Sequence, residues 1–294
     1  MRTETFETPG PVRLDVEMPA GEIEIATATT DETHVELESL SSNEQLQEMV
    51  AAARIESIRR GDVFHVTVEV RTRHGVWISF RGGPDIQLGT PQMRLRISCP
   101  AGAELDVKTK SADLQAHGEY GDVDFKTASG DLSIETARNA HVKTASGDIH
   151  FETVGGVLDV KSVSGDVHVA SVAGNATFQV VSGDVFVHDA GGSISASSVS
   201  GDQRYEAVVS GRVDLRAVSG DLAVGIRRGS RVYIDANTVS GSTSSEFELS
   251  DAPAAPPAPV ADTPPLADAP LVEVYAKTVS GDVRLERAPA PLTA

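Results

Sequence analysis

A short motif, Ser-Gly-Asp, recurs at nearly constant spacing through the chain, and this repeat constrains the fold more than any other feature. Six intact copies begin at Ser129, Ser146, Ser164, Ser182, Ser200 and Ser219. Variant or displaced copies begin at Ser111, Ser240 and Ser280. Successive serines are 18, 17, 18, 18, 18, 19, 21 and 40 residues apart. A fixed period of this size is typical of a solenoid, in which each repeat is one coil stacked on the last.

Each repeat contains two short segments in which apolar and polar residues alternate. In most coils apolar residues stand three and five positions after the Ser, as at Val167 and Val169, and six and four positions before it, as at Leu158 and Val160. Glycines near the midpoint between motifs mark a second corner. Two strands and two corners in about 18 residues predict a narrow parallel β-solenoid, with neighbouring strands about 4.8 Å apart.

The first hundred residues lack the repeat and predict a β-rich N-terminal module at 1–104. Apolar and polar residues alternate over 11–18, 22–26, 33–40, 63–71 and 92–98, which is typical of half-buried strands. A capping pair at 42–43 followed by spaced apolar residues predicts one short helix near 43–58. The predicted fold class is therefore all-β: a parallel β-solenoid at 105–294 preceded by this module.

Residues 250–270 interrupt the last repeat with a Pro/Ala-rich sequence that cannot form a strand ladder. The motif returns at 277–283. We predict a disordered insertion at 250–270, after which the chain comes back to lay down the closing coil. The alternative is a linker to a detached final strand.

Composition limits the classes of function. The formal net charge of −18 argues against binding to nucleic acid or to an anionic membrane surface. Cys99 is the only cysteine, so an intrachain disulfide is impossible. No apolar run approaches the 18 or so residues of a transmembrane segment, and no apolar leader begins the chain. These features predict a soluble, cytoplasmic protein.

Stacking the coils turns equivalent positions into columns, of which the Asp column is the most regular. It comprises Asp131, Asp148, Asp166, Asp184, Asp202 and Asp221. One interpretation is local: the glycine takes a left-handed conformation, and the Asp oxygen accepts backbone N–H bonds at the corner. The other is a row of Ca²⁺ sites, although calcium-binding β-rolls place one Asp in each half-coil and this chain has one in each coil.

Two further columns precede each Ser. Three positions before it stand the lysines Lys108, Lys126, Lys143 and Lys161, which either bind a polyanionic partner or form a solvated face that discourages aggregation. One position before it stand Ala128, Ala145, Val163, Val181, Val199, Val218, Val239 and Val279. If this last column points inward it is core, and if it points outward it is an apolar docking stripe. The sequence leaves the choice open.

The segment 75–83 is the most apolar short run and contains Trp77, Ile78 and Phe80. It is either a hairpin tip packed on its own module or a patch for a partner or for self-association.

The sequence contains no catalytic constellation and calls for no cofactor. The many serines are corner residues without a base at useful spacing, and His150 and His168 lack a third metal ligand. The tyrosines Tyr120, Tyr205, Tyr233 and Tyr275 do not align into a sugar-binding platform. We therefore predict that the protein is not an enzyme.

The repeated coils, with Lys-Thr-Ala-Ser-Gly-Asp at 126–131 and 143–148 and Pro-x-Gly patterns at 19–25 and 100–107, resemble a bacterial putative-adhesin domain of unknown function. The resemblance covers nearly the whole chain and implies a β-solenoid after a β-rich module, with no binding residues to transfer. Ser242 in place of Asp and the Pro/Ala insertion depart from the pattern.

These observations predict a non-enzymatic β-solenoid scaffold, adhesin-like in its repeats, that binds a protein partner or itself. Two alternatives remain: a Ca²⁺-dependent binding module that uses the Asp column, and a β-helix enzyme that acts on polysaccharide.

Overall fold

A computed structural model describes residues 1–71, 93–247 and 270–288, which form strands and one helix. The chain divides into two compact units, residues 1–152 and 153–294, and each is described by itself. Parallel β-solenoid coils occur in both units, so the predicted fold class is confirmed. Residues 250–269 of the predicted insertion, and the Trp77 segment, lie outside the described residues.

The first unit contains one helix and most of the longer strands. They are β1 (Arg2–Glu7), β2 (Val12–Ala28), β3 (Glu32–Ser39), α1 (Glu44–Ala52), β4 (Arg54–Arg60), β5 (Val63–Glu69), β6 (Met93–Pro100), β7 (Ala103–Lys126), β8 (Leu132–Ser146) and β9 (Ile149–Val154).

Strand β2 already has the shape of a coil. Its first half pairs in parallel with β5 and its second half with β6, and both halves pair in parallel with β7. Its middle, Ala20 and Gly21, lies beside Ser111 and Ala112, so the early Pro-x-Gly turn occupies the corner that the Ser-Gly-Asp motif takes later. The predicted domain boundary near residue 104 stays a prediction.

Antiparallel strands and the helix cover the N-terminal end of this unit. β3 pairs antiparallel with β1 and β6, and β4 pairs antiparallel with β5. The Asn43 side chain caps α1 by accepting the Gln45 N–H at 2.9 Å, as the sequence predicted. The helix is shorter than the predicted 43–58, because residues 54–60 pair with β5 as β4.

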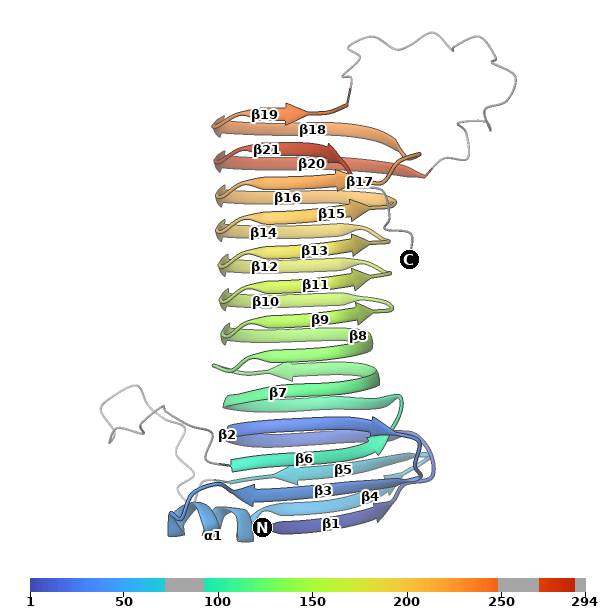
Figure 1. Ribbon diagram of the computed structural model, residues 1–294, viewed down its shortest axis with the longest axis vertical. Coiled ribbons are helices and arrows are strands. Elements are labelled where there is room, and N and C mark those ends of the chain that lie inside the picture. The colour runs from blue at the N-terminus through green and yellow to red at the C-terminus, as the bar shows by residue number, and fades with distance from the viewer. Residues whose placement is uncertain (72–92, 248–269, 289–294) are drawn as a thin grey trace. The chain divides into compact units, whose positions relative to one another are not determined.

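The second unit is a regular stack of two-stranded coils (Figure 1). Its strands are β10 (Leu158–Ser164), β11 (Val167–Val172), β12 (Ala176–Ser182), β13 (Val185–Ala190), β14 (Ile194–Ser200), β15 (Gln203–Val208), β16 (Gly211–Ser219), β17 (Leu222–Ile226), β18 (Arg231–Ser240), β19 (Thr243–Ser245), β20 (Leu271–Ser280) and β21 (Val283–Arg287). Strands before the motif pair in parallel on one face, and strands after it pair on the other.

Alternation fills the interior of this unit with aliphatic and a few aromatic side chains. Val160, Val169, Phe178 and Leu215 are each at most 1% exposed. Tyr205 is also buried, and its hydroxyl donates to Gln203 Oε1 at 3.5 Å. Such columns of like side chains give each coil the same cross-section, so one coil fits directly on the next.

The last coil in sequence is not the last in space. β20 pairs with β16 on one side and with β18 on the other, and β21 lies between β17 and β19 in the same way (Figure 1). The prediction that residues after the insertion form the closing coil is therefore wrong. As a result β20, with a neighbour on each side, buries Val272, Val274 and Ala276, whereas β18 is exposed or half-buried at every position.

Glycine at the corner is a steric requirement. Gly201 has φ +125°, and a Cβ there would lie 2.1 Å from the Gly183 carbonyl oxygen of the neighbouring coil. Gly183 stands in the same relation to Gly165, with a distance of 2.2 Å. Each coil can approach its neighbour this closely only if no side chain intervenes.

We expect Gly201→Ala to lower the free energy of unfolding by about 2–4 kcal/mol, because it adds both a forbidden φ and a backbone clash. The adjacent exposed change Ser200→Ala is the matched control and should shift stability by less than about 0.5 kcal/mol. Chemical denaturation of the two variants checks this, and equal stabilities would contradict the steric account.

Candidate functional site

The side chains of the Asp column accept hydrogen bonds from the backbone of the neighbouring coil. In the second unit, Oδ1 of Asp166 accepts the backbone N–H of Asp184 at 2.9 Å, and Oδ1 of Asp184 accepts that of Asp202 at 2.8 Å. Asp202 accepts the N–H of Asp221 at 2.8 Å. The first unit repeats the contact, since Asp131 accepts the Asp148 N–H at 2.9 Å. These bonds form an Asp ladder along the corner.

The ladder also explains the one copy that lacks Asp. Asp221 accepts the N–H of Asp282 at 2.8 Å, and Asp282 Oδ1 accepts both the N–H and the hydroxyl of Ser242 at 2.9 Å. The bonds to Ser242 lower the pKa of Asp282, and Arg284 adds to this effect. In the described stack no coil lies beyond Ser242, so no amide there needs a carboxylate acceptor.

The ladder supports the local interpretation of the Asp column. One oxygen of each of these Asp side chains accepts an amide of the next coil, which offsets part of the repulsion between carboxylates about 5 Å apart. Within residues 1–71, 93–247 and 270–288, no group of three or more His, Cys, Asp or Glu is arranged to hold a metal ion. The ladder accounts for the motif without a cation.

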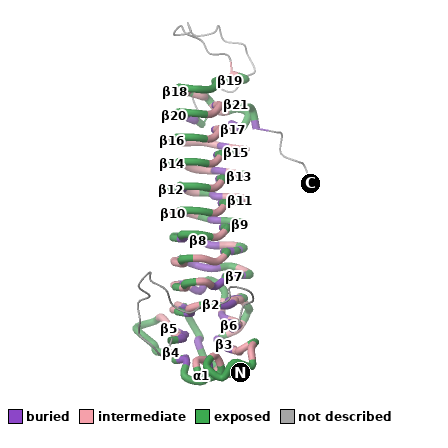
Figure 2. Tube along the Cα trace, turned by 90° about the vertical axis from the view of Figure 1, so that its left-hand side faces the viewer, coloured by how far each residue is buried: buried purple, intermediate pink, exposed green. Residues whose placement is uncertain are grey.

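The valine column points outward. In spatial order the second unit presents Val163, Val181, Val199, Val218, Val279 and Val239, which are 53%, 45%, 50%, 51%, 51% and 83% exposed. Their strands are successive neighbours in the sheet, so the column is about 24 Å long at the usual strand spacing. We call these six residues the valine stripe. Figure 2 shows the exposed segments on the same side of successive coils.

The alternation of the strand explains this direction. The residue before most of these valines turns inward: Ser162, Val180, Ser198 and Thr278 are buried, and Thr238 is half-buried. The hydroxyls of Ser162 and Thr278 bond the backbone carbonyl two residues later, at 3.1 Å to Ser164 and 3.2 Å to Ser280. The corner supplies an acceptor for a hydroxyl at the inward position, and the alternation of the strand turns the next residue to solvent.

The lysine column lies outward as expected and is partly neutralised within its own strand. Lys108 Nζ is 3.1 Å from Asp106, and Lys126 Nζ is 2.8 Å from Asp124, a hydrogen bond that raises the pKa of Lys126. Lys143 is exposed and Lys161 is half-buried. Binding of a polyanion by this column stays a prediction. Trp77, Ile78 and Phe80 lie outside the described residues, and their role also stays a prediction.

Two tyrosines come together although the sequence reading found no alignment. The rings of Tyr233 and Tyr275 lie 5.8 Å apart, tilted by 48°, and the Arg212 guanidinium stacks over Tyr275 at 4.1 Å. They are neighbours because β20 lies between β16 and β18. Tyr120 and Tyr205 are buried, and their burial raises the pKa of each hydroxyl. Two rings beside an arginine do not make a long sugar platform.

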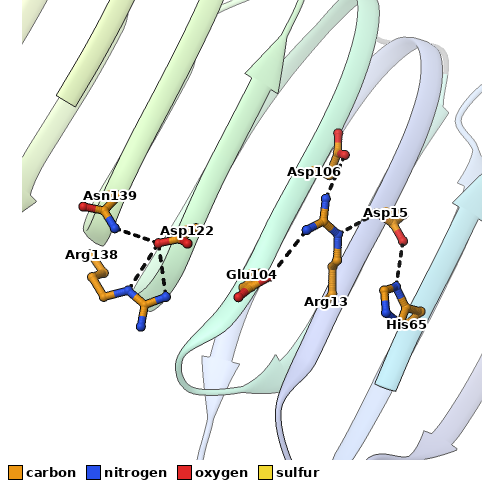
Figure 3. Close-up of polar contacts among 8 residues, drawn as sticks. All are labelled: Arg13, Asp15, His65, Glu104, Asp106, Asp122, Arg138 and Asn139. Carbon is orange, nitrogen blue, oxygen red and sulfur yellow. Dashed lines mark hydrogen bonds and ion pairs between the residues drawn. The ribbon is translucent and has the colours of Figure 1, made fainter. Parts of the chain in front are cut away.

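A small network of ion pairs links neighbouring strands of the first unit (Figure 3). Arg13 lies 3.2 Å from Asp15, 3.1 Å from Asp106 and 3.5 Å from Glu104, and His65 Nδ1 lies 3.4 Å from Asp15. Partial burial lowers the pKa of Arg13, but the hydrogen bonds and charges of Asp15 and Asp106 outweigh this and raise it. The network links β2 to β7 and β5.

A shallow depression of about 210 Å³ lies beside this network. It is lined by Asp15, Val16, Glu17, Thr67, Val68, Glu69, Asp106 and Lys108. Its volume is below that of typical small-molecule pockets, about 300–1,000 Å³. Among its lining residues Lys108 pairs with Asp106, while Asp15 pairs with Arg13 and His65 and Glu69 pairs with Arg71. The alternation in the sequence indicates that the polar side chains of this region face outward, but it does not predict which of them form ion pairs.

The single thiol is inert. Cys99 is fully buried in the first unit, and burial raises its pKa to about 12. A thiol with so high a pKa stays protonated at neutral pH and is a poor nucleophile. Among the described residues, no helix is long and apolar enough to cross a membrane.

The stacked corners, the two-stranded coils and the outward columns define a parallel β-solenoid repeat protein. The sequence model described as Toastrack DUF4097 matches residues 12–255, which is most of the chain. The protein belongs to this family. The predicted resemblance to a domain of unknown function is thereby confirmed, while the narrower Ser-Gly-Asp-repeat adhesin family stays a prediction.

Solved structures of low identity match over nearly their full length. One described as a putative adhesin from Bacteroides fragilis shares 11% identity at a TM-score of 0.37 and covers 96% of each chain. One from Parabacteroides distasonis, also described as a putative adhesin, shares 11% identity at a TM-score of 0.41, with 97% of this chain and 96% of that chain covered. One described as a putative cell adhesion protein from Clostridium sporogenes shares 10% identity at a TM-score of 0.26, with 97% of this chain and 99% of that chain covered. No curated protein matches.

The ladder predicts different outcomes for two substitutions at Asp202. Asp202→Ala removes the acceptor of the Asp221 amide and should lower stability by about 1 kcal/mol. Asp202→Asn keeps an oxygen acceptor and removes a charge from the column, so its melting temperature should equal or exceed that of the wild type. Thermal melts with Ca²⁺ and with EDTA check both. Equal loss in the two variants, together with a rise in melting temperature on adding Ca²⁺, would restore the calcium interpretation.

Asp122 provides a test by pH. The amide of Asn139 donates to its Oδ1 at 2.8 Å and Arg138 donates at 3.1 Å, and these contacts lower the pKa of Asp122 (Figure 3). Because the folded-state pKa lies below the unfolded one, this contact stabilises the fold above the unfolded pKa and is lost as the pH falls through the folded pKa.

We expect Asn139→Ala to raise the pKa of Asp122 towards its ordinary value, since it removes the largest cause of the shift. An NMR titration of the Asp122 carboxyl carbon in the wild type and the variant measures this. An unchanged titration curve would show that the hydrogen bond from Asn139 does not lower the pKa of Asp122.

Proposed function

We propose that the protein is a non-enzymatic scaffold that binds a protein partner, or a second copy of itself, through the valine stripe. The observation that carries the proposal is the exposure of six aligned valines on successive strands of one face. The coil repeat holds these side chains at fixed spacing. Such a surface binds through shape and apolar contact.

The stripe carries a free-energy cost that a partner would relieve. Each valine leaves about half or more of its side chain in water, although its neighbours in the column cover part of it. Burial of apolar surface gains about 25 cal/mol per Å². Contiguous exposed apolar patches on soluble proteins are often interaction sites, especially when polar residues border them.

Polar columns border the stripe on both sides and define the chemistry of the partner. On one side lie the corner carboxylates, of which Asp184 and Asp202 are exposed. On the other side lie Gln179 and Ser197 in the middle of the stack, and Arg216 further along. A partner with an apolar ridge and basic side chains along one edge complements this arrangement, in keeping with the net charge of −18.

The absence of enzymatic activity is part of the same proposal. The candidate nucleophiles described above are buried or serve as corner residues, and the charged cluster around Arg13 is paired internally. The polysaccharide-enzyme alternative needs an open cleft with acidic groups beside aromatic rings. Tyr233 is exposed and Tyr275 is half-buried, and Arg212 covers one face of the Tyr275 ring.

The test is the double change Val181→Asp with Val199→Asp. Both positions face solvent, so we expect the fold to keep its stability within about 1 kcal/mol while association weakens at least tenfold. The matched control is Thr177→Asp with Ser195→Asp, which adds the same charges to the same two strands at outward positions four residues from the stripe.

Two measurements read the result. Sedimentation equilibrium reports self-association, and affinity capture from a lysate of the native host, read by mass spectrometry, reports partners. The proposal predicts that the valine variant loses the association that the wild type and the control retain. If all three proteins bind equally, the valine stripe is not the binding surface.

A further inference from the structure

The coil formed by β20 and β21, which we call the C-terminal rung (residues 270–288), fills a slot between two coils that precede it in sequence. One wall of the slot is the coil of β16 and β17, and the other is the coil of β18 and β19. Figure 1 shows the rung between these coils. Neither wall is joined to the rung by a short turn, because residues 246–270 separate β19 from β20, and β18 and β19 separate β17 from the rung in sequence.

Backbone bonds join the rung to both walls. The Leu222 N–H donates to the Asp282 carbonyl at 2.8 Å, and the Val283 N–H donates to the Ser242 carbonyl at 2.9 Å. The Asp ladder passes through the rung in the same direction, from Asp221 to Asp282 and on to Ser242. Every one of these contacts is non-covalent.

The rung also completes the core. Val272, Val274, Ala276 and Val283 are fully buried, and Leu285 is 1% exposed. In the described stack β18 pairs with β20 and β19 pairs with β21, so the outer coil is held to the rest of the unit through the rung. Without it the edge of β16 and β17 is an open parallel edge with apolar side chains beneath it, which is a template for strand addition.

We propose that this slot also accepts the C-terminal rung of a second copy, so that the protein forms dimers by exchanging the rung. The contacts are the same whether the rung comes from the same chain or from another, since no covalent turn distinguishes the two cases. Reciprocal exchange fills both slots and leaves no apolar edge open. The partner is therefore a second copy of this chain, and residues 270–288 are the exchanged element.

Chain order favours exchange during folding. Residues 231–245 are made before the rung but acquire their neighbour only when the rung arrives, so the edge of β16 and β17 stays open until the last step. The rung of the same chain competes with the rung of a second copy for the slot. Its effective concentration, set by the tether to its own chain, is on the order of 1 mM. Exchange should therefore increase as the protein concentration during folding approaches that value.

The test uses two full-length variants with one new cysteine each. Ala223 of β17 and Arg284 of β21 are register partners in neighbouring coils and lie away from the valine stripe on the opposite face. Ala223→Cys and Arg284→Cys chains are unfolded together, refolded at about 1 μM or about 1 mM, and treated with a dithiol cross-linker shorter than about 8 Å, which spans one strand spacing. Native Cys99 is fully buried and does not react in the folded protein.

Exchange predicts a covalent dimer between the two variants that is at least tenfold more abundant after refolding at the higher concentration. The double variant, with both cysteines in one chain, should cross-link within the chain at low concentration. A Phe186→Cys chain mixed with the Arg284→Cys chain is the collision control, because Phe186 lies two coils away from Ala223 in register.

Two outcomes overturn the proposal. If the double variant cross-links but the mixture forms no more dimer than the collision control, the rung inserts only within its own chain. If the double variant does not cross-link either, the slot itself is wrong. Repeating the mixture in the Val181→Asp, Val199→Asp background separates this proposal from the valine stripe, since exchanged dimers persist there even when association through the stripe is lost.

Discussion

The structure depends on one repeated contact, the stacking of Ser-Gly-Asp corners. Glycine lets the backbone of one coil come within van der Waals distance of the next, and the Asp carboxylate takes the amide that the turn would leave without an acceptor. The amide of Gly201 in turn donates to the Ser219 carbonyl at 3.2 Å. These two kinds of hydrogen bond join each corner to the next and fix the register of the strands on either side of it. The apolar columns are aligned by this register.

The register also determines which residues the corners expose to solvent. Alternation places the residue before the motif serine in solvent, and in the second unit this residue is a valine in all six coils. The carboxylates stand on one side of the valines, held by the ladder, and polar or basic side chains stand on the other. The scaffold therefore presents a straight apolar row with unlike edges, which is the surface on which the proposed binding rests.

The coil architecture could be predicted from the sequence because the period and the alternation of apolar and polar residues are local properties that recur in every repeat. It could not give the direction of the valine column, since that depends on whether the hydroxyls of residues such as Ser162 find partners inside the corner. The order of the last coils was predicted wrongly, although a signal existed: Ser242 lacks the carboxylate that an internal coil needs. The meeting of Tyr233 with Tyr275 was missed for the same reason, as it depends on which coil lies between β16 and β18.

The most direct test of the central claim is native-state hydrogen exchange at the corner amides of Asp184, Asp202, Asp221 and Asp282. These residues lie in turns with exposed or half-buried side chains, where amides ordinarily exchange fast. The ladder predicts that they exchange as slowly as amides in the adjoining strands, and that Asp221 alone becomes fast when Asp202 is changed to Ala. Fast exchange at all four corners in the wild type would contradict the claim that carboxylates bind the coils together.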